Sequence, residues 1–143
     1  MTGGNSPRKI DITIPLAPTG QARPRFTRTG IAYKHKSQAT REAQLLSYLV
    51  PFAPKEPSSD PLSLKVDAIL PIPQSWPKKK KEAAILGEVP TTKKPDLSNI
   101  IKQIEDVMQG IFFVDDKQVC QISARKRYGR HPGWEITIQY WRP

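Results

Sequence analysis

Acidic side chains gather in one short stretch of an otherwise basic chain. Residues 96–116 contain one base, Lys102, and five acids: Asp96, Glu105, Asp106, Asp115 and Asp116. This segment carries −4, whereas 22 bases and 8 acids give the rest of the chain +14. Crowded carboxylates repel one another unless a cation binds between them, and magnesium prefers one or two carboxylates together with phosphate oxygens. The pattern predicts a divalent metal site that acts on a phosphodiester, because such an ion can polarise the scissile phosphate.

The residues that would line this site follow a helical period. Residues 97–109 place their apolar side chains within one arc, and Asn99, Lys102 and Asp106 project from the opposite stripe at spacings i, i+3 and i+7. Asp96 lies at the entrance of this predicted helix. Lys102 is suited to stabilise the negative charge that develops on the phosphate during cleavage.

The two aspartates that follow the helix complete the candidate metal site. Gly110 is predicted to end the helix, residues 111–114 are expected to form a short strand, and Asp115 and Asp116 come next. A strand that returns from so tight a corner would bring Asp116 toward Asp96. We therefore expect Asp96 and Asp116 to be the principal metal ligands, with Asp115 as a further ligand.

Each of these residues also has an ordinary structural alternative. Asp96 precedes a helix and is a common type of N-cap, and an Asp115–Asp116 pair is typical of turns. Lys102 alone would be a solvated helix residue. Their combination within one basic chain is what favours metal chemistry over these separate roles.

The rest of the chain predicts an α+β fold in one small domain, residues 10–143, preceded by a flexible tail, residues 1–9. Alternating segments predict strands, longer periods predict helices, and 15 prolines keep the elements short. The order predicts a mostly antiparallel mixed sheet with two or three helices on one face, the first helix being capped by Ser37. The expected elements are strands at 10–16, 62–72, 111–114, 118–129 and 134–141, an irregular hairpin at 17–36, and helices at 37–50, 78–86 and 97–109.

The net charge of +10, from 23 Lys and Arg against 13 Asp and Glu, predicts a polyanionic partner, most commonly nucleic acid. The run Lys78–Lys81 is either a DNA contact or a solvated face. Phe26, Trp76 and Tyr128 are either stacking platforms for unpaired bases or core residues. The candidate DNA-binding residues are Arg23, Arg25, Arg28, Lys126 and Arg127.

Several other function classes lack their sequence signatures. Cys120 is the only cysteine, which excludes an intramolecular disulfide and favours a reducing compartment. His35 and His131 lie too far apart in the sequence for a zinc motif, and the chain contains no glycine-rich phosphate loop. It shows neither a secretory signal nor an apolar run long enough to span a bilayer, so we expect a cytoplasmic protein.

The stretch TTKKPDLSNIIKQIEDVMQGIFFVDDKQV (91–119) resembles the signature of the RusA family of Holliday junction resolvases. That signature runs P-D-x-D-N-x-x-K, followed by an acidic residue, a glycine and a D-D pair before a strand. Two further segments, GQARPRF (20–26) and PIPQSWPKKKK (71–81), resemble the amino-terminal and middle parts of the family. The resemblance covers most of residues 10–128.

The resemblance implies a small dimeric α+β endonuclease, of bacterial, phage or prophage origin, that cuts four-way DNA junctions with magnesium or manganese. The essential aspartates of the family would map onto Asp96, position 98 and Asp116, and its helical lysine onto Lys102. A four-way junction has two equivalent strands to cut, and a twofold homodimer would present two equivalent sites to them.

The chain departs from the family pattern at one of these positions, because Ser98 stands where the family has aspartate. Either the site works with fewer carboxylates, supported by Asp106 or Asp115 with Ser98 and Asn99, or its activity is reduced. The leading hypothesis is a structure-selective endodeoxyribonuclease of DNA recombination and repair. A non-catalytic nucleic-acid-binding module is the alternative, and a structural RNA protein would explain the charge but not the clustered acids.

Overall fold

A four-stranded mixed sheet organises the part of the chain that the computed structural model describes, which is residues 8–20, 25–26, 28, 32–33 and 36–141. β6 (Gly133–Tyr140) pairs antiparallel with both β1 (Lys9–Ile14) and β4 (Leu62–Pro71), whereas β4 and β5 (Val119–Gly129) run parallel. This arrangement confirms the predicted α+β class with a mostly antiparallel mixed sheet. The strand order is β1, β6, β4 and β5.

The period of two in the sequence gives the sheet one apolar face. In β1 the side chains of Ile10, Ile12 and Ile14 are buried and those between them are exposed, as a half-covered strand requires. β4 is paired on both sides, and its second half, residues 66–70, is buried on both faces. The main core lies between the apolar face and the helices.

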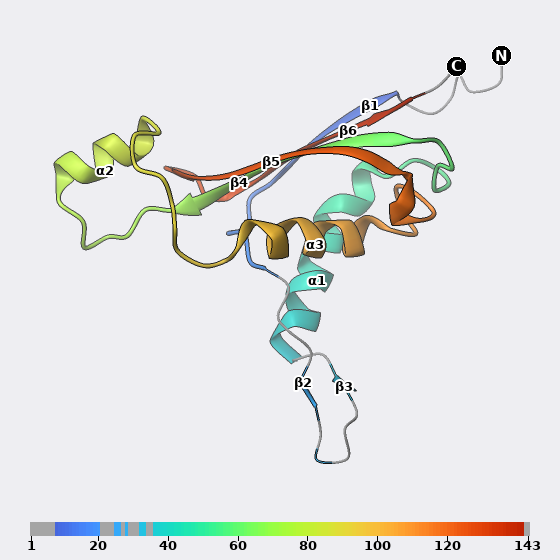
Figure 1. The fold of residues 1–143 in the computed structure, drawn as a ribbon, viewed down its shortest axis with the longest axis horizontal. Helices are drawn as coiled ribbons and strands as arrows, with labels where there is room; N and C mark the ends of the chain where they lie inside the picture. The colour runs from blue at the N-terminus through green and yellow to red at the C-terminus, as the bar shows by residue number, and fades with distance from the viewer. Residues whose placement is uncertain (1–7, 21–24, 27, 29–31, 34–35, 142–143) are drawn as a thin grey trace.

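Two helices cover this face of the sheet, α1 (Lys36–Leu49) and α3 (Leu97–Met108) (Figure 1). In α3 the buried residues Ile100, Ile104 and Met108 are spaced by four, which is the apolar arc predicted from the sequence. Gly110 follows α3 with a φ of 89°, as expected for the residue after a helix. α1 already begins at Lys36, so the prediction that Ser37 caps it was wrong.

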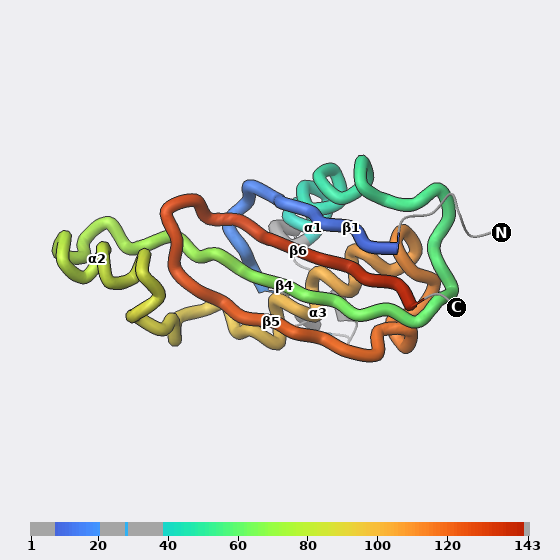
Figure 2. The backbone as a smooth tube through the Cα atoms, turned by 90° about the horizontal axis from the view of Figure 1, so that it is seen from above, coloured from blue at the N-terminus to red at the C-terminus, as the bar shows by residue number. Residues whose placement is uncertain are grey.

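A third helix, α2 (Lys78–Ile85), lies beyond one end of the sheet (Figure 2). It is attached by a small second cluster in which Ala84 packs with Leu70 and Tyr128. α2 and α3 together form the connection from β4 to β5, because two parallel strands can be joined only by a long crossover.

The predicted hairpin before α1 is present as the antiparallel pair β2 (Arg25–Phe26) and β3 (Ala32–Tyr33), which projects away from the sheet (Figure 1). A 3₁₀ helix, η1 (Val50–Phe52), follows α1. Of the predicted tail, residues 1–7 lie outside the described residues. Within the described residues, no helix combines the length and apolarity needed to cross a bilayer.

The strand predicted at 111–114 is a turn in the structure, and within the described residues its β-pairing is limited to isolated bridges of Phe113 to Ser58 and Gln109. Phe112 and Phe113 are both fully buried, which a half-covered strand with alternating faces does not allow. The hydroxyl of Tyr140 donates a hydrogen bond of 2.8 Å to the carbonyl of Phe112. The turn is therefore anchored in the core.

Candidate active site

Asp96 stands at the N-cap position of α3, where its backbone is extended, with φ −68° and ψ 142°. An N-cap aspartate normally accepts a hydrogen bond from a backbone amide of the first turn. Within the described residues, the Asp96 carboxylate accepts no such bond, and the residue is exposed. The position matches the structural alternative, but both carboxylate oxygens remain available to a ligand.

The start of α3 is held in place by β5. The Nζ atom of Lys126 donates hydrogen bonds to the carbonyls of Lys93 at 2.8 Å and Pro95 at 3.2 Å. These two carbonyls belong to the segment that leads directly into Asp96. Lys126, a predicted DNA-binding residue, therefore positions the candidate site.

The segment before the hairpin supports the same end of α3 from the other side. A Cβ atom at Gly20 would lie 2.9 Å from the Cβ of Asn99 and 3.1 Å from that of Pro95, so glycine permits this close approach. The hydroxyl of Thr19 donates a hydrogen bond of 3.2 Å to Oε1 of Gln103. Segment 19–20 thus packs on the first two turns of α3.

Asp115 and Asp116 begin a 3₁₀ helix, η2 (Asp116–Gln118), which is firmly held. The side chain of Gln118 accepts a hydrogen bond from the Asp115 amide at 2.8 Å and donates to the carbonyls of Ser58 at 2.8 Å and Asp60 at 2.9 Å. This clamp fixes where the exposed Asp116 lies relative to the core.

Asp115 caps η2, accepting a hydrogen bond of 3.0 Å from the amide of Lys117 at its Oδ1. That hydrogen bond is the main reason why the pKa of Asp115 is lowered, and the positive charge of Lys117 lowers it further. Asp115 therefore has the structural role in a turn that the sequence analysis gave as the alternative to metal binding. A metal-ligand role for Asp115 stays a prediction.

Asp116 lies close enough to the second half of α3 to act on Glu105. The pKa of Glu105 is raised by partial burial first, then by the negative charges of Asp116 and Asp106, while Lys102 lowers it. Three residues of the predicted site, Lys102, Asp106 and Asp116, thus lie near enough to act on Glu105, which the predicted site did not include. Its spacing of i+3 from Lys102 was the available signal.

Asp96 lies nine residues before Glu105, which corresponds to about 13 Å along the axis of α3. Within the described residues, no three His, Cys, Asp or Glu side chains gather closely enough to hold a metal ion. The convergence of Asp96 and Asp116 on one cation stays a prediction. The donors themselves suit a hard divalent ion, because they are carboxylates and because added positive charge would relieve the repulsion at Glu105.

The raised pKa of Glu105 makes stability depend on pH. The folded chain holds this proton to a higher pH than the unfolded chain, whose value is near 4.5. Stability is therefore lost as pH rises from 4.5 through the folded pKa, and the loss persists above it. We expect Glu105→Gln to have a higher thermal midpoint than the wild type at pH 7 and the same midpoint below pH 4.5.

Thermal melts across pH, with and without magnesium, check this expectation. Magnesium should raise the midpoint of the wild type more than that of Glu105→Gln, since the ion relieves a repulsion that the variant lacks. Glu88→Gln, an exposed change of the same type, should behave like the wild type. Equal pH profiles for Glu105→Gln and the wild type would contradict the repulsion.

Lys126 and Arg127, which were predicted to bind DNA, make contacts inside the protein. The buried carboxylate of Asp67 in β4 accepts hydrogen bonds from Nε of Arg125 at 3.1 Å and from Nε of Arg127 at 3.1 Å. Arg127 is thus held on the sheet, as Lys126 is held against the segment before α3. Arg28 is exposed, whereas Arg23 and the side chain of Arg25 lie outside the described residues.

The aromatic residues divide in a similar way. Tyr128 is buried and meets Trp76 edge-on, with ring centroids 5.1 Å apart at 70°. Lys80 places its Nζ 4.0 Å from the centroid of the Trp76 ring. Both rings therefore belong to the small cluster that attaches α2. This matches the core role that the sequence analysis gave as the alternative to base stacking. The side chain of Phe26 lies outside the described residues.

Comparison with known proteins adds two findings. The family model described as "Endodeoxyribonuclease RusA" matches residues 15–139. A Bacillus subtilis (strain 168) protein named "Uncharacterized protein YqaN" is 31% identical over 137 residues, which cover 91% of this chain and 95% of that protein. Both matches extend over most of the sheet and over the whole of α3 and η2.

Proposed function

This chain belongs to the RusA family of endodeoxyribonucleases, and on that premise we propose that it is a magnesium-dependent nuclease that resolves four-way DNA junctions. The observation that carries the proposal is an acidic group of Glu105 and Asp106 in α3 with Asp116 in η2, in which the charges of Asp106 and Asp116 raise the pKa of Glu105. This group lies in a chain whose remaining residues are strongly basic. Such a site attracts a divalent cation while the basic surroundings attract DNA.

In this proposal each side chain of the site has its own role in binding the ion or the phosphate. Asp96 and Asp116 provide the carboxylate oxygens that hold the ion, and Glu105 and Asp106 strengthen the negative field around it. Lys102 donates hydrogen bonds to the phosphate and offsets the charge that grows on it during cleavage. A bound magnesium or manganese ion would polarise the phosphate and neutralise the leaving oxygen.

The proposal is tested with an end-labelled four-way junction incubated with the protein and magnesium. Nicked duplex products should form with magnesium or manganese and disappear when EDTA is added. A non-catalytic junction-binding protein is the second candidate, favoured by Ser98 at the position where the family has aspartate. Salt-sensitive binding without product in either metal would support that second candidate.

A homodimer is part of the proposal, because a twofold assembly presents two equivalent sites to the two equivalent strands of a junction. Sedimentation of the protein alone and bound to a junction measures this. The proposal requires two copies per junction. One copy per junction together with paired cleavage would contradict it.

The first turn of α2 is a proposed contact to the DNA backbone. It consists of Lys78–Lys81 and has no acidic residue, although the positive end of a helix dipole disfavours lysines there. Binding of a polyanion such as DNA would explain why lysines occupy this unfavourable end of the helix. Lys78 and Lys79 are exposed, so they are the two residues to test.

We expect Lys78→Gln combined with Lys79→Gln to weaken junction binding at moderate salt and to make it less salt-dependent. Each lost phosphate contact should reduce the slope of log K against log salt by about 1. Fluorescence anisotropy over a salt series measures the slope. A double change to glutamine of Lys9, at the start of β1, and Lys55, in the loop before β4, is the control, because both residues are exposed and outside α2. Equal slopes for both double variants would place the α2 lysines outside the DNA contact.

A further inference from the structure

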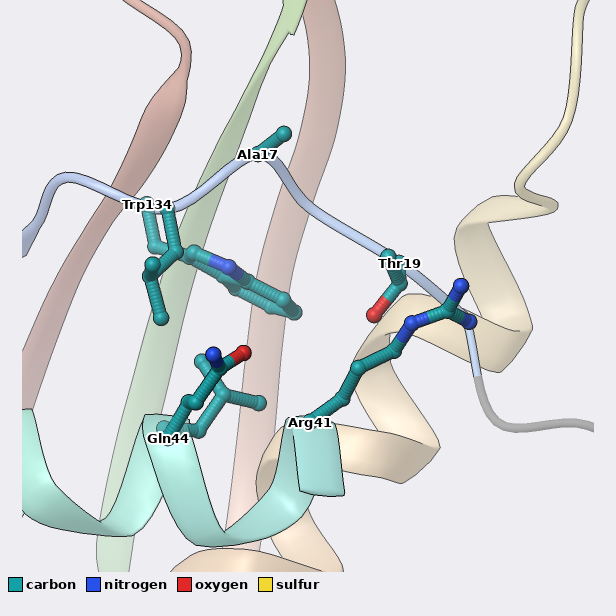
Figure 3. Close-up of a pocket in the computed structure, with 7 residues that line it drawn as sticks. Ala17, Thr19, Arg41, Gln44 and Trp134 are labelled. Carbon is teal, nitrogen blue, oxygen red and sulfur yellow. The ribbon is translucent and has the colours of Figure 1, made fainter. Parts of the chain in front are cut away.

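A cavity of about 170 Å³ opens between α1, the segment after β1 and the beginning of β6. Its apolar lining comes from Leu16, Leu45 and the indole of Trp134 (Figure 3). A cavity of roughly 150 Å³ is known to accept one benzene ring. This pocket, which we call the Trp134 pocket, therefore has room for one ring and not for a whole nucleotide.

The Trp134 pocket also has polar groups, and some of them are unpartnered. Nε1 of Trp134 is buried and has no hydrogen-bond partner among the described residues, and the same is true of Nε2 of Gln103. Gln103 adjoins the pocket through its hydrogen bond of 3.2 Å with Thr19, which lines it. Buried donors are nearly always paired in folded proteins. An unpaired donor on a residue that lines the cavity, Trp134, with a second one on the adjoining Gln103, points to a ligand that carries acceptors.

The mouth of the pocket adds a positive charge. Arg41 lines the pocket from α1 and is exposed, and its side chain extends toward Thr19 in Figure 3. The indole N–H, the Gln103 amide and the guanidinium are all donors. The matching ligand is a flat ring with carbonyl or ring-nitrogen acceptors, attached to an anionic group outside.

The pocket adjoins the candidate active site. Thr19 lines it, and the next residue, Gly20, rests on Asn99 and Pro95 at the start of α3. A DNA strand that crosses the start of α3 near Asp96 would therefore pass the mouth of the pocket.

We propose that the Trp134 pocket receives one unstacked base of the DNA at the branch point, with Arg41 on the neighbouring phosphate. This inference rests on the proposed function. A branch point is where bases leave the stack most easily, and nucleic-acid enzymes bind such bases by ring contacts and by hydrogen bonds to the base edge. All four bases carry a six-membered ring with acceptors, so the pocket selects for an unstacked base and not for one sequence.

The test uses four-way junctions in which single branch-point nucleotides are replaced by an abasic analogue. Anisotropy in EDTA measures their affinity without cleavage. For one abasic position the wild type should bind about tenfold more weakly than to the intact junction, as expected when one base–aromatic contact is lost. Gln44→Phe, at an exposed residue that lines the pocket and points toward Trp134 in Figure 3, should fill it, so that intact and abasic junctions bind equally.

Two further variants sharpen the test. Trp134→Phe removes the indole donor and should also reduce the abasic effect, whereas Ala43→Phe, at an exposed position of α1 outside the pocket, should retain the wild-type effect. If Gln44→Phe loses affinity at the abasic position as the wild type does, or if the wild type shows no abasic effect, the inference is overturned.

Cleavage of the intact junction is measured in parallel, which separates this inference from the proposed function. A wild type that cuts with magnesium but shows no abasic effect would contradict the base-binding role of the Trp134 pocket and leave the nuclease proposal intact. A wild type that never cuts but shows an abasic effect abolished by Gln44→Phe would contradict the nuclease proposal and support the pocket.

Discussion

Asp96→Asn and Asp116→Asn are each expected to lower the rate of junction cleavage by more than about 100-fold, while junction binding stays equal or becomes tighter. Asparagine keeps the size of the side chain but removes the charge that magnesium requires. Loss of a group that only supports a metal ligand already costs about 10–100-fold, so loss of a ligand should cost more. Binding survives because removing negative charge weakens repulsion of the phosphates.

Single-turnover cleavage and anisotropy binding, measured on the same junction, check both halves of this expectation. Asp11→Asn is the matched control, because Asp11 is an exposed aspartate of β1, away from α3. It should cut like the wild type. Full activity in both Asp96→Asn and Asp116→Asn would remove the proposed metal ligands, and a loss of binding in parallel with cleavage would point to damage of the fold.

Ser98→Asp is expected to raise the cleavage rate, by about tenfold or more if it supplies a missing carboxylate beside the ion. Ser98 is exposed in the first turn of α3, two residues after Asp96. An acid near the start of a helix is also favoured by the helix dipole, so the substitution should not weaken α3. A junction-binding protein that lost its nuclease through this position would gain activity where the wild type has little.

The rate gain is measured under single-turnover conditions with magnesium, and thermal melts confirm the fold. Ser98→Asn, which adds a side chain of similar size without charge, should show no gain. If Ser98→Asp cuts no faster than Ser98→Asn, the charge at position 98 does not limit the reaction, and Ser98 no longer favours the non-catalytic alternative.

Most of the fold could be predicted because the pattern within each element is strong. α3 repeats its buried residues Ile100, Ile104 and Met108 every fourth position, and β1 alternates Ile10, Ile12 and Ile14 with polar residues. Local periods of this kind need no knowledge of distant partners. The family resemblance in 91–119, confirmed by the family match over residues 15–139, rests on the same local signals.

The turn at 111–114 could not be predicted, because its conformation depends on contacts from elsewhere in the chain. Four apolar residues in a row fit a strand, but Phe112 and Phe113 both enter the core. The carbonyl of Phe112 accepts hydrogen bonds from two distant groups, the hydroxyl of Tyr140 and the backbone amide of Ser58. These partners, Tyr140 near the end of β6 and Ser58 in the loop before β4, lie far from the turn in the sequence, so no local pattern reveals them.

The candidate site was predictable as a set of residues but not as a geometry. The helical period placed Lys102 and Asp106 on one stripe, and the chain order placed Asp116 after the turn. Asp116 acts on Glu105 because the hydrogen bonds of Gln118 hold η2 in place. No local sequence pattern reveals these hydrogen bonds. Likewise, the sequence predicts that Lys126 and Arg127 bind DNA. In the structure Lys126 donates a hydrogen bond to the carbonyl of Lys93, and Arg127 donates one to the carboxylate of Asp67.

The location of the ion is measured most directly by iron-mediated cleavage of the polypeptide. Fe²⁺ replaces magnesium, ascorbate and peroxide generate hydroxyl radicals beside it, and mass spectrometry locates the backbone breaks. We predict breaks around residues 96–98 and 115–117 that vanish in excess magnesium and in Asp116→Asn. Breaks confined to other parts of the chain, or breaks that persist unchanged in Asp116→Asn, would contradict the proposal that the carboxylates of α3 and η2 hold the divalent ion.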